Sequence, residues 1–254
     1  MIANYHTHSR WCKHAQGEPE EYVEEAIRLG FKELAFTEHV PHRQGFCWLH
    51  YEELEEYNAA IDACIARYAD RIHLVKGFEC EYYPSELDDY RMLREKYGFS
   101  FLILGQHEAG PNREVNVFAP KTSDAMELYA DSICAGLATG EFCMLAHPDV
   151  IMGNFIGGWD AKCEKAFHRI FACCEDHRIP VEINVNGMRG DRGYPDENAL
   201  RISTQYRLEY LINTDAHNPA GLWDDKCEKA YALAERLGIT VTPRLRPEQL
   251  LPRG

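Results

Sequence analysis

The sequence lacks the features that mark a membrane or secreted protein. No apolar run approaches the ~18 residues that a membrane-spanning helix needs. Residues 1–4 lead directly into polar chemistry at His6, without the apolar core of a signal peptide. The ten cysteines include no CxxC pair and are scattered along the chain, so we interpret them as reduced thiols that pack as small apolar groups. These absences predict a cytoplasmic protein that does not bind a membrane.

Positive charge is also scarce, which limits the possible partners. The chain has 27 basic and 41 acidic residues, for a formal net charge of -14, and this balance disfavours a nucleic-acid polymer as the ligand. The GxGxxG and GxxxxGK[ST] fingerprints of dinucleotide and triphosphate sites are absent. An anionic small molecule is still possible, because metal ions in a compact pocket dominate the local field. The sequence does not indicate an oligomeric state.

What is present is a regular alternation of short apolar runs and longer amphipathic runs, the pattern of βα units. Strands are predicted over residues 1–5, 34–36, 73–78, 101–104, 143–145, 181–183 and 211–212. Helices are predicted over residues 19–29, 51–68, 85–97, 123–138, 162–176, 197–206 and 225–237. With no linker or composition break, we predict a single α/β domain over 1–254, a closed or nearly closed parallel barrel. The proline-containing tail from residue 242 either folds back or stays loose.

Metal-binding residue types follow most of the predicted strands. They are His6, His8 and His14 after the first strand, His39 after the second, Glu79 after the third, His107 after the fourth, His147 after the fifth, and Asp215 and His217 after the seventh. In a parallel barrel these strand ends meet in one active-site basin. A lone HxH pair is often incidental, but chance does not explain nine such residues on six of seven strands.

The residue types and their spacing point to hydrolysis at bound metal ions. Imidazoles and carboxylates ligate zinc, manganese and iron, and the i, i+2 spacing of His6 and His8, or of Asp215 and His217, places each pair on one side of a strand end. A carboxylate such as Glu79 can bridge two ions. Two ions about 3.5–4 Å apart can hold a hydroxide and clamp the oxygens of an in-line displacement. We therefore predict a metal-dependent hydrolase with two or three divalent ions, zinc, manganese or iron.

The remaining histidines have weaker placements. His42 lies either at the mouth of the pocket or in a loop outside it. His50, His73, His168 and His177 follow no predicted strand, and we expect them on the surface or in the core.

Several motifs resemble those of the PHP family, named for polymerases and histidinol phosphatases. They are YHTHSRWCKHA at the start, TEH at 37–39, GFECEY at 77–82, AHPD at 146–149 and TDAH at 214–217. The resemblance covers essentially the whole chain, and the opening and the EIN…G.R stretch are most similar to the histidinol-phosphate phosphatase branch. It implies a distorted seven-stranded (β/α)7 barrel, TIM-like, with a trinuclear site.

Motif by motif, the resemblance also implies roles for individual residues. One ion would be held by His6, His8, Glu79 and Asp215, a second by Glu79, His107 and His147, and the third by His14, His39 and His217. Arg189 matches the arginine of the family's N..G.R motif and would bind phosphate. Asp215, His217 and Arg189 are thus the candidate catalytic residues, and Arg189 and His42 the candidate substrate contacts.

The implied reaction is hydrolysis of a small phosphate monoester, L-histidinol phosphate, by a metal-bridging hydroxide. The sequence differs from the histidinol-phosphate phosphatase branch at LGQHEAGPNREVNVFAP, at Asn186 and at Glu81. These differences bear on the identity of the substrate more than on the type of reaction. A substrate ammonium group would need a carboxylate, for which Glu18, Glu81 and Glu108 are candidates.

Three alternatives remain open at this stage. The substrate could be a nucleotide or sugar phosphate, or the chain could be a non-catalytic metal-bound module that serves a partner protein. An amidohydrolase also opens with HxH on a β/α barrel, but those enzymes usually need a strand-end lysine, and Lys76 lies inside the third predicted strand.

Overall fold

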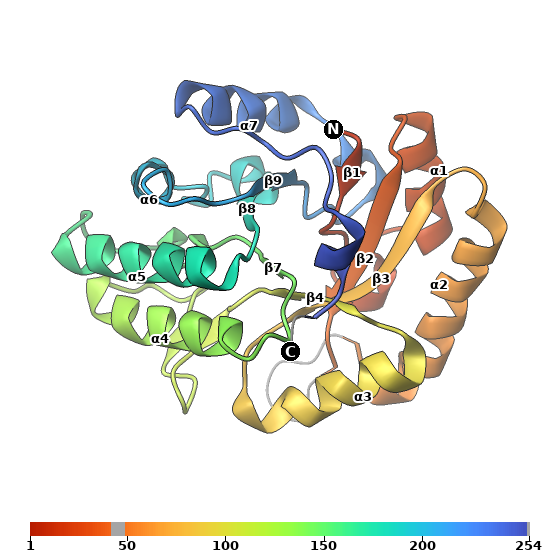
Figure 1. The fold of residues 1–254 in the computed structure, drawn as a ribbon, viewed down its shortest axis with the longest axis horizontal. Coiled ribbons are helices and arrows are strands. Elements are labelled where there is room, and N and C mark those ends of the chain that lie inside the picture. Colours follow the sequence, from red (N-terminus) through yellow and green to blue (C-terminus); the bar gives the residue numbers. More distant parts are fainter. Residues whose placement is uncertain (42–48, 253–254) are drawn as a thin grey trace.

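Seven parallel strands form a nearly closed barrel in the computed structural model, which describes residues 1–41 and 49–252 (Figure 1). The strands run in the order β1-β2-β3-β4-β7-β8-β9 around the sheet. Their bounds are β1 Ala3–Asn4, β2 Glu33–His39, β3 His73–Cys80, β4 Phe101–Leu104, β7 Met144–Leu145, β8 Val181–Asn184 and β9 Tyr210–Asn213. The seven-stranded α/β barrel expected from the sequence is therefore confirmed.

Side chains as well as backbone groups join the first and last strands. The Tyr5 amide donates to Asn213 Oδ1 at 2.9 Å, and the Thr214 amide donates to Asn4 Oδ1 at 2.7 Å. Just beyond the strands, the His8 amide donates to the Ala216 carbonyl at 2.9 Å. These bonds hold the strand ends after β1 and β9 side by side, which brings the HxH and DxH segments together.

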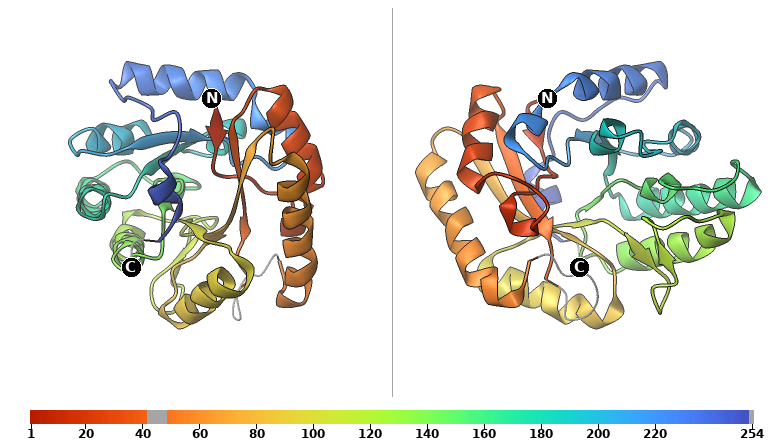
Figure 2. Two further views of the ribbon diagram at one scale, coloured as in Figure 1. Left: turned by 45° about the vertical axis from the view of Figure 1, so that its right-hand side comes forward. Right: turned by 180° about the vertical axis from the view of Figure 1, so that it is seen from behind.

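Helices cover the outside of the barrel. They are α1 Pro19–Arg28, α2 Leu54–Tyr68, α3 Leu87–Tyr97, α4 Met126–Leu137, α5 Ala161–His177, α6 Glu197–Ser203 and α7 Asp225–Arg236. Figure 2 shows α1–α3 beside the first strands and α4–α7 beside the later ones. Asp160, Asp196 and Asp224 each accept backbone N–H bonds at the start of α5, α6 and α7, which fixes where these helices begin.

The C-terminal tail folds back onto the barrel. Leu245 and Leu250, the latter in a 3-10 helix over Pro247–Leu250, are buried in one cluster with Ala3, Tyr5, Phe101 and other strand residues. The Tyr5 hydroxyl accepts a hydrogen bond from the Leu245 amide at 2.9 Å. Of the two possibilities left open by the sequence, the folded tail is the one observed.

A small antiparallel hairpin lies between β4 and α4, where no strand was predicted. It pairs β5 (Glu108–Ala109) with β6 (Val115–Asn116). The buried ammonium of Lys121 donates to the carbonyls of Val117 and Gly153, so the end of the hairpin segment is tied to the loop that follows β7. The LGQHEAGPNREVNVFAP segment therefore has a fixed position beside the barrel mouth.

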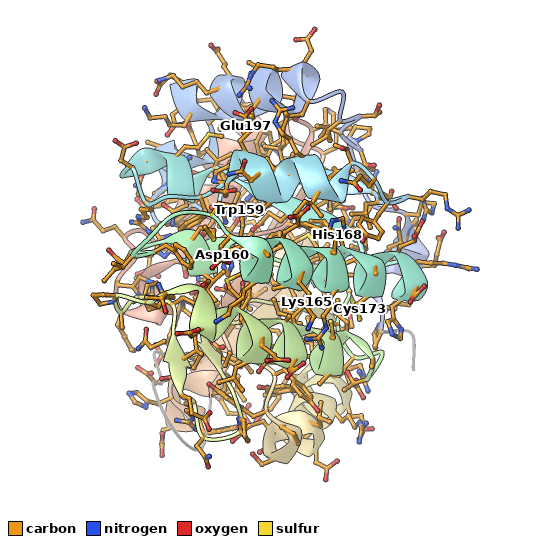
Figure 3. The ribbon with its side chains drawn as sticks, turned by 90° about the vertical axis from the view of Figure 1, so that its left-hand side faces the viewer. Trp159, Asp160, Lys165, His168, Cys173 and Glu197 are labelled. Carbon is orange, nitrogen blue, oxygen red and sulfur yellow. The ribbon has the colours of Figure 1, made fainter. Side chains whose placement is uncertain are left out.

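The histidines that follow no predicted strand lie elsewhere. His168 is on the outer side of α5 (Figure 3), with Nδ1 2.8 Å from the Tyr206 hydroxyl. His73, the first residue of β3, pairs with Glu33, and His50 precedes the 3-10 helix that leads into α2. Within the described residues, no helix is both long and apolar enough to span a membrane.

Candidate metal centre

All nine predicted ligands lie together at the carboxyl end of the barrel. A cavity of about 540 Å³ opens there, and it is lined by His8, His14, His39, Glu79, His107, His147, Asp215 and His217. His6 is fully buried, with Nε2 3.1 Å from His8 Nε2 and 3.4 Å from Glu79. The strand-end argument thus correctly predicted that these residues converge, whereas their individual roles remain proposals.

Glu79 is at the centre of the group. Its Oε2 lies 3.4 Å from His6 Nε2, 3.3 Å from His8 Nε2 and 3.2 Å from His39 Nδ1. Its other oxygen, Oε1, lies 2.7 Å from His147 Nε2 and 3.5 Å from His107 Nε2. Because each oxygen faces a different set of imidazoles, this carboxylate is placed to bridge two ions.

The donor atoms of the cluster fit a bound cation. Ring nitrogens face each other at 3.1 Å between His6 and His8 and at 3.0 Å between His14 and His217. Asp215 Oδ1, which lies 3.3 Å from His8 Nε2, is buried and has no hydrogen-bond partner among the described residues. An orphaned buried oxygen is costly in a protein without a ligand. A divalent ion among these atoms would satisfy the oxygen and the ring nitrogens together.

Two of these residues hold their positions with an unusual backbone. Asp215 has φ 46° and His147 has φ 22°, values in the left-handed region that non-glycine residues seldom adopt. Such conformations cost about 1–3 kcal/mol each and cluster at functional sites. The surrounding fold therefore stabilises a ligand arrangement that the local sequence alone would not adopt.

The observed groups differ in detail from the three sets implied by family resemblance. Potential ligand atoms converge in four groups: His6, His8 and Glu79; His6, His147 and Asp215; His39, Glu79 and His107; and His8, Cys12 and His217. His39 is thus grouped with Glu79 and His107, whereas His14 faces His217. The groups overlap, so the structure supports metal-holding clusters without fixing how many ions they take.

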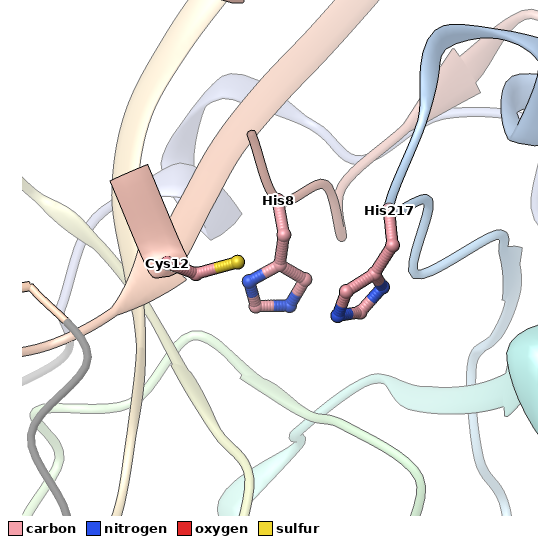
Figure 4. A group of neighbouring side chains, drawn as sticks. All are labelled: His8, Cys12 and His217. Atoms are coloured by element: carbon pink, nitrogen blue, oxygen red, sulfur yellow. The ribbon is translucent and has the colours of Figure 1, made fainter. Parts of the chain in front are cut away.

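Cys12 was not among the sequence candidates for the site. Its thiol is buried and points toward the ring of His8, with His217 on the other side of that ring (Figure 4). The Cys12 carbonyl also lies 2.7 Å from His14 Nδ1. The 3-10 helix Arg10–Cys12 therefore positions two histidines of the site.

Two carboxylates that are not among the candidate ligands orient the imidazoles. Glu182 in β8 lies 2.9 Å from His6 Nδ1 and accepts a hydrogen bond from the His147 amide at 2.8 Å. Glu81 does the same for His107, at 2.8 Å from Nδ1. A partner of this kind fixes the ring and its tautomer. The signal in the sequence is an acidic residue inside an apolar strand, and the EIN…G.R motif contains Glu182 without indicating this role.

Replacing Glu182 with glutamine should weaken metal binding while leaving every candidate ligand in place. Loss of such an outer partner typically reduces metal affinity by about 10–100-fold. We expect a shift of this size in competition titrations with a metal-sensitive chelating dye. Glu197→Gln is the matched control, because this half-buried glutamate at the start of α6 pairs with Arg201 and Arg236 and does not line the cavity. Equal affinity in both variants would contradict the orienting role of Glu182.

The charge states of the group suit metal binding. Burial opposes charge on Glu79, but the imidazoles of His39 and His6 hold the pKa of its carboxyl well below the usual range. Burial lowers the pKa of His39 well below its ordinary value and the pKa of His217 to about 4. Burial also acts against charge on His107, but the carboxylates of Glu79 and Glu81 raise its pKa to about 9. Burial likewise acts against charge on His6 and His8, but neighbouring carboxylates, Asp215 and Glu79 among them, raise the pKa of both rings well above the ordinary value. Ionised carboxylates and neutral imidazoles are the forms that ligate a metal, so binding would displace the protons of His6, His8 and His107.

Arg189 does not face the cavity in this structure, contrary to the expected phosphate contact. Its Nε donates to Asp224 at 2.7 Å, Nη1 to the Thr214 carbonyl at 2.8 Å and Nη2 to the Gly221 carbonyl at 2.7 Å. All three nitrogens are therefore used to hold the loops after β9. The arginine that lines the cavity is Arg192, three residues further on, and the sequence reasoning missed it. His42, the other expected substrate contact, lies outside the described residues.

The rest of the cavity wall contains polar and aromatic groups that the sequence did not single out as a set. They are Glu81, Tyr83, Glu108, Asn116, Phe118, Asn186 and Tyr194. Asn186 Nδ2 donates to Asp215 Oδ2 at 3.1 Å, so it orients a candidate ligand.

A β/α barrel with imidazoles and carboxylates converging at the carboxyl ends of its strands is the architecture of a metal-dependent enzyme. A family model for the PHP domain matches residues 4–186. The chain therefore belongs to the PHP domain family, as the motif resemblance indicated.

Known proteins similar to this chain agree with that assignment. A probable histidinol-phosphatase from Schizosaccharomyces pombe is 33% identical, over 86% of this chain and 81% of its own length. A probable histidinol-phosphatase from Deinococcus radiodurans is 25% identical, over 98% of both chains. The fold matches that of histidinol phosphate phosphatase from Lactococcus lactis, solved with zinc, L-histidinol and phosphate, with a TM-score of 0.77 and 19% identity over 100% of this chain and 99% of the other.

Proposed function

We propose that this chain is a phosphoric monoester hydrolase whose substrate is L-histidinol phosphate. The observation that carries the proposal is the convergence of nine imidazole and carboxylate side chains, eight of which line one cavity that also contains an arginine. The two relatives named as probable histidinol-phosphatases, aligned over most of this chain, support the choice of substrate.

The proposed cofactors are two or three divalent ions of zinc, manganese or iron. His6, His8, Glu79 and Asp215 would hold one ion, Glu79 with His107 and His147 a second, and His14, His39 and His217 a third. Bound there, such ions lower the pKa of water to about 7 and neutralise charge on the phosphate. The mixed nitrogen and oxygen donor set suits all three metals.

The side chains of the cavity have separate tasks in this proposal. Arg192 binds the non-bridging oxygens of the phosphate, since a guanidinium offers two parallel donors to an oxyanion. Asp215 would hold an ion through Oδ1, and Asn186 fixes that carboxylate through Oδ2. The attacking water loses a proton to solvent and its oxygen bonds directly to phosphorus as the bond from phosphorus to the ester oxygen breaks. The ester oxygen takes up a proton from solvent and leaves as the alcohol. No covalent intermediate is needed, which agrees with the burial of the Cys12 thiol against His8.

The test is initial-rate phosphate release by the purified, metal-assayed protein from L-histidinol phosphate and from a panel of nucleotide, sugar and aryl phosphates. We expect kcat/KM for L-histidinol phosphate to exceed the others by roughly 100-fold or more, because correct polar contacts to the alcohol part add several kcal/mol of discrimination. Uniformly slow rates would retain a monoesterase but reject this substrate. No release from any ester, with metals bound, would favour the non-catalytic module.

A further inference from the structure

One side of the cavity contains groups that are suited to an alcohol and not to a phosphate. Tyr83 follows β3, Glu108 is in β5, Asn116 is in β6 and Phe118 lies just beyond the hairpin. We call these four residues the outer wall. They offer one carboxylate, one amide and two aromatic rings, whereas the phosphate would contact the histidine cluster and Arg192.

Glu108 is the carboxylate of this wall that remains available to a ligand. Among the described residues its contacts fall on Oε2, which accepts a hydrogen bond from the Tyr83 hydroxyl at 3.0 Å and lies 3.7 Å from Arg113 Nε. The second distance is longer than a direct hydrogen bond. The side chain is 25% exposed, so the carboxylate is oriented but still accessible from the cavity.

The other two acidic candidates from the sequence are already engaged. Glu81 accepts hydrogen bonds from the His107 and Glu108 amides and lies 2.8 Å from His107 Nδ1. Glu18 starts α1, pairs with Arg10 and does not line the cavity. The structure thus separates three acids that the sequence left equivalent.

Phe118 gives this wall a flat apolar surface. The residue is 63% exposed, and its ring stacks on His107, with centroids 5.3 Å apart and planes 16° from parallel. The same ring lines the cavity, so a bound ligand can pack against it. A planar heterocycle could stack there, beside the amide of Asn116.

We propose that the outer wall binds the alcohol part of the substrate, with the Glu108 carboxylate accepting hydrogen bonds from a protonated amine and Phe118 stacking on a planar ring. The ligand class is therefore the phosphate ester of an amino alcohol with an aromatic heterocycle. This inference rests on the proposed function, because it assumes that the cavity hydrolyses a phosphate ester. The β5–β6 hairpin is then the segment that determines which ester is accepted.

The test compares two esters that differ only in the amine: L-histidinol phosphate and its deamino analogue. Glu108→Gln should lower kcat/KM for the amine ester by about 10–100-fold, the range expected for a charge-assisted hydrogen bond, and should affect the deamino ester by less than about 3-fold. Glu114→Gln removes an exposed carboxylate from the same hairpin and should keep the wild-type ratio of the two esters.

Tyr83→Phe provides a second variant if Glu108→Gln does not fold, as judged by circular dichroism and metal content. It removes the hydroxyl that orients Glu108 and should cause a smaller loss, again on the amine ester alone. Equal losses on both esters, or an unchanged ratio, would overturn the inference while leaving the phosphatase intact. A wild-type protein without activity on L-histidinol phosphate would instead refute the proposed function, and this inference with it.

Discussion

Glu79→Gln is expected to lower kcat/KM by ~1000-fold or more, since in the proposed role of Glu79 as a bridging ligand its loss removes several kcal/mol of charge stabilisation from the reaction. Both oxygens of Glu79 face imidazoles, five of them within 3.5 Å. A glutamine side chain keeps the shape of glutamate but carries no charge. Its NH₂ group would replace a negatively charged oxygen next to the ring nitrogens. The metal content per chain should fall as well.

The measurement combines phosphate release with metal analysis of extensively dialysed protein. Glu114→Gln serves as the control, because it makes the same chemical change on the exposed part of the hairpin. If Glu79→Gln retained full metal content and lost activity by less than about 10-fold, Glu79 would not be a bridging ligand. The small loss of activity would then reflect contacts with a single ion.

The positions of the nine candidate ligands could be predicted because a parallel barrel directs them. Each strand of such a barrel ends at the same face, so residues far apart in sequence, such as His6 and His217, meet whenever their strands are identified correctly. The strands themselves could be predicted from short apolar runs in the sequence. The seven-stranded barrel and the clustering of the predicted ligands followed from these local patterns together.

The direction of a loop side chain could not be predicted in the same way. Arg189 and Arg192 are three residues apart in one loop, and the motif favoured Arg189. What decides between them is Asp224, 35 residues further along the chain, together with two carbonyls of the loops after β9. No local pattern encodes a contact of that kind.

The hairpin that forms part of the cavity wall could not be predicted from the sequence, for a related reason. Its strands β5 and β6 have two residues each, too short for an alternating pattern to be recognised. Its position depends on Lys121, whose ammonium holds two loop carbonyls. Glu182 was recognised only within a motif, because its role depends on His6 and His147 from other strands.

Replacing Arg192 with methionine should mainly reduce activity, whereas replacing Arg189 with methionine should mainly reduce stability. Arg192→Met is expected to reduce kcat/KM by about 100–1000-fold, the usual cost of losing one preorganised donor to a reacting oxyanion, with little change in stability. Arg189→Met should lower the free energy of unfolding by roughly 2–4 kcal/mol, because it leaves Asp224 and the carbonyls of Thr214 and Gly221 without their donor.

Urea denaturation and phosphate release on the same preparations separate these effects. Arg192 is exposed at the cavity, so its loss leaves few internal contacts broken, whereas Arg189 is partly buried among its acceptors. Arg192→Lys should recover part of the activity, since an ammonium retains the charge without the paired donors. Wild-type activity in Arg192→Met, with a large loss in a fully folded Arg189→Met, would restore Arg189 as the phosphate ligand and require its side chain to leave Asp224 when substrate binds.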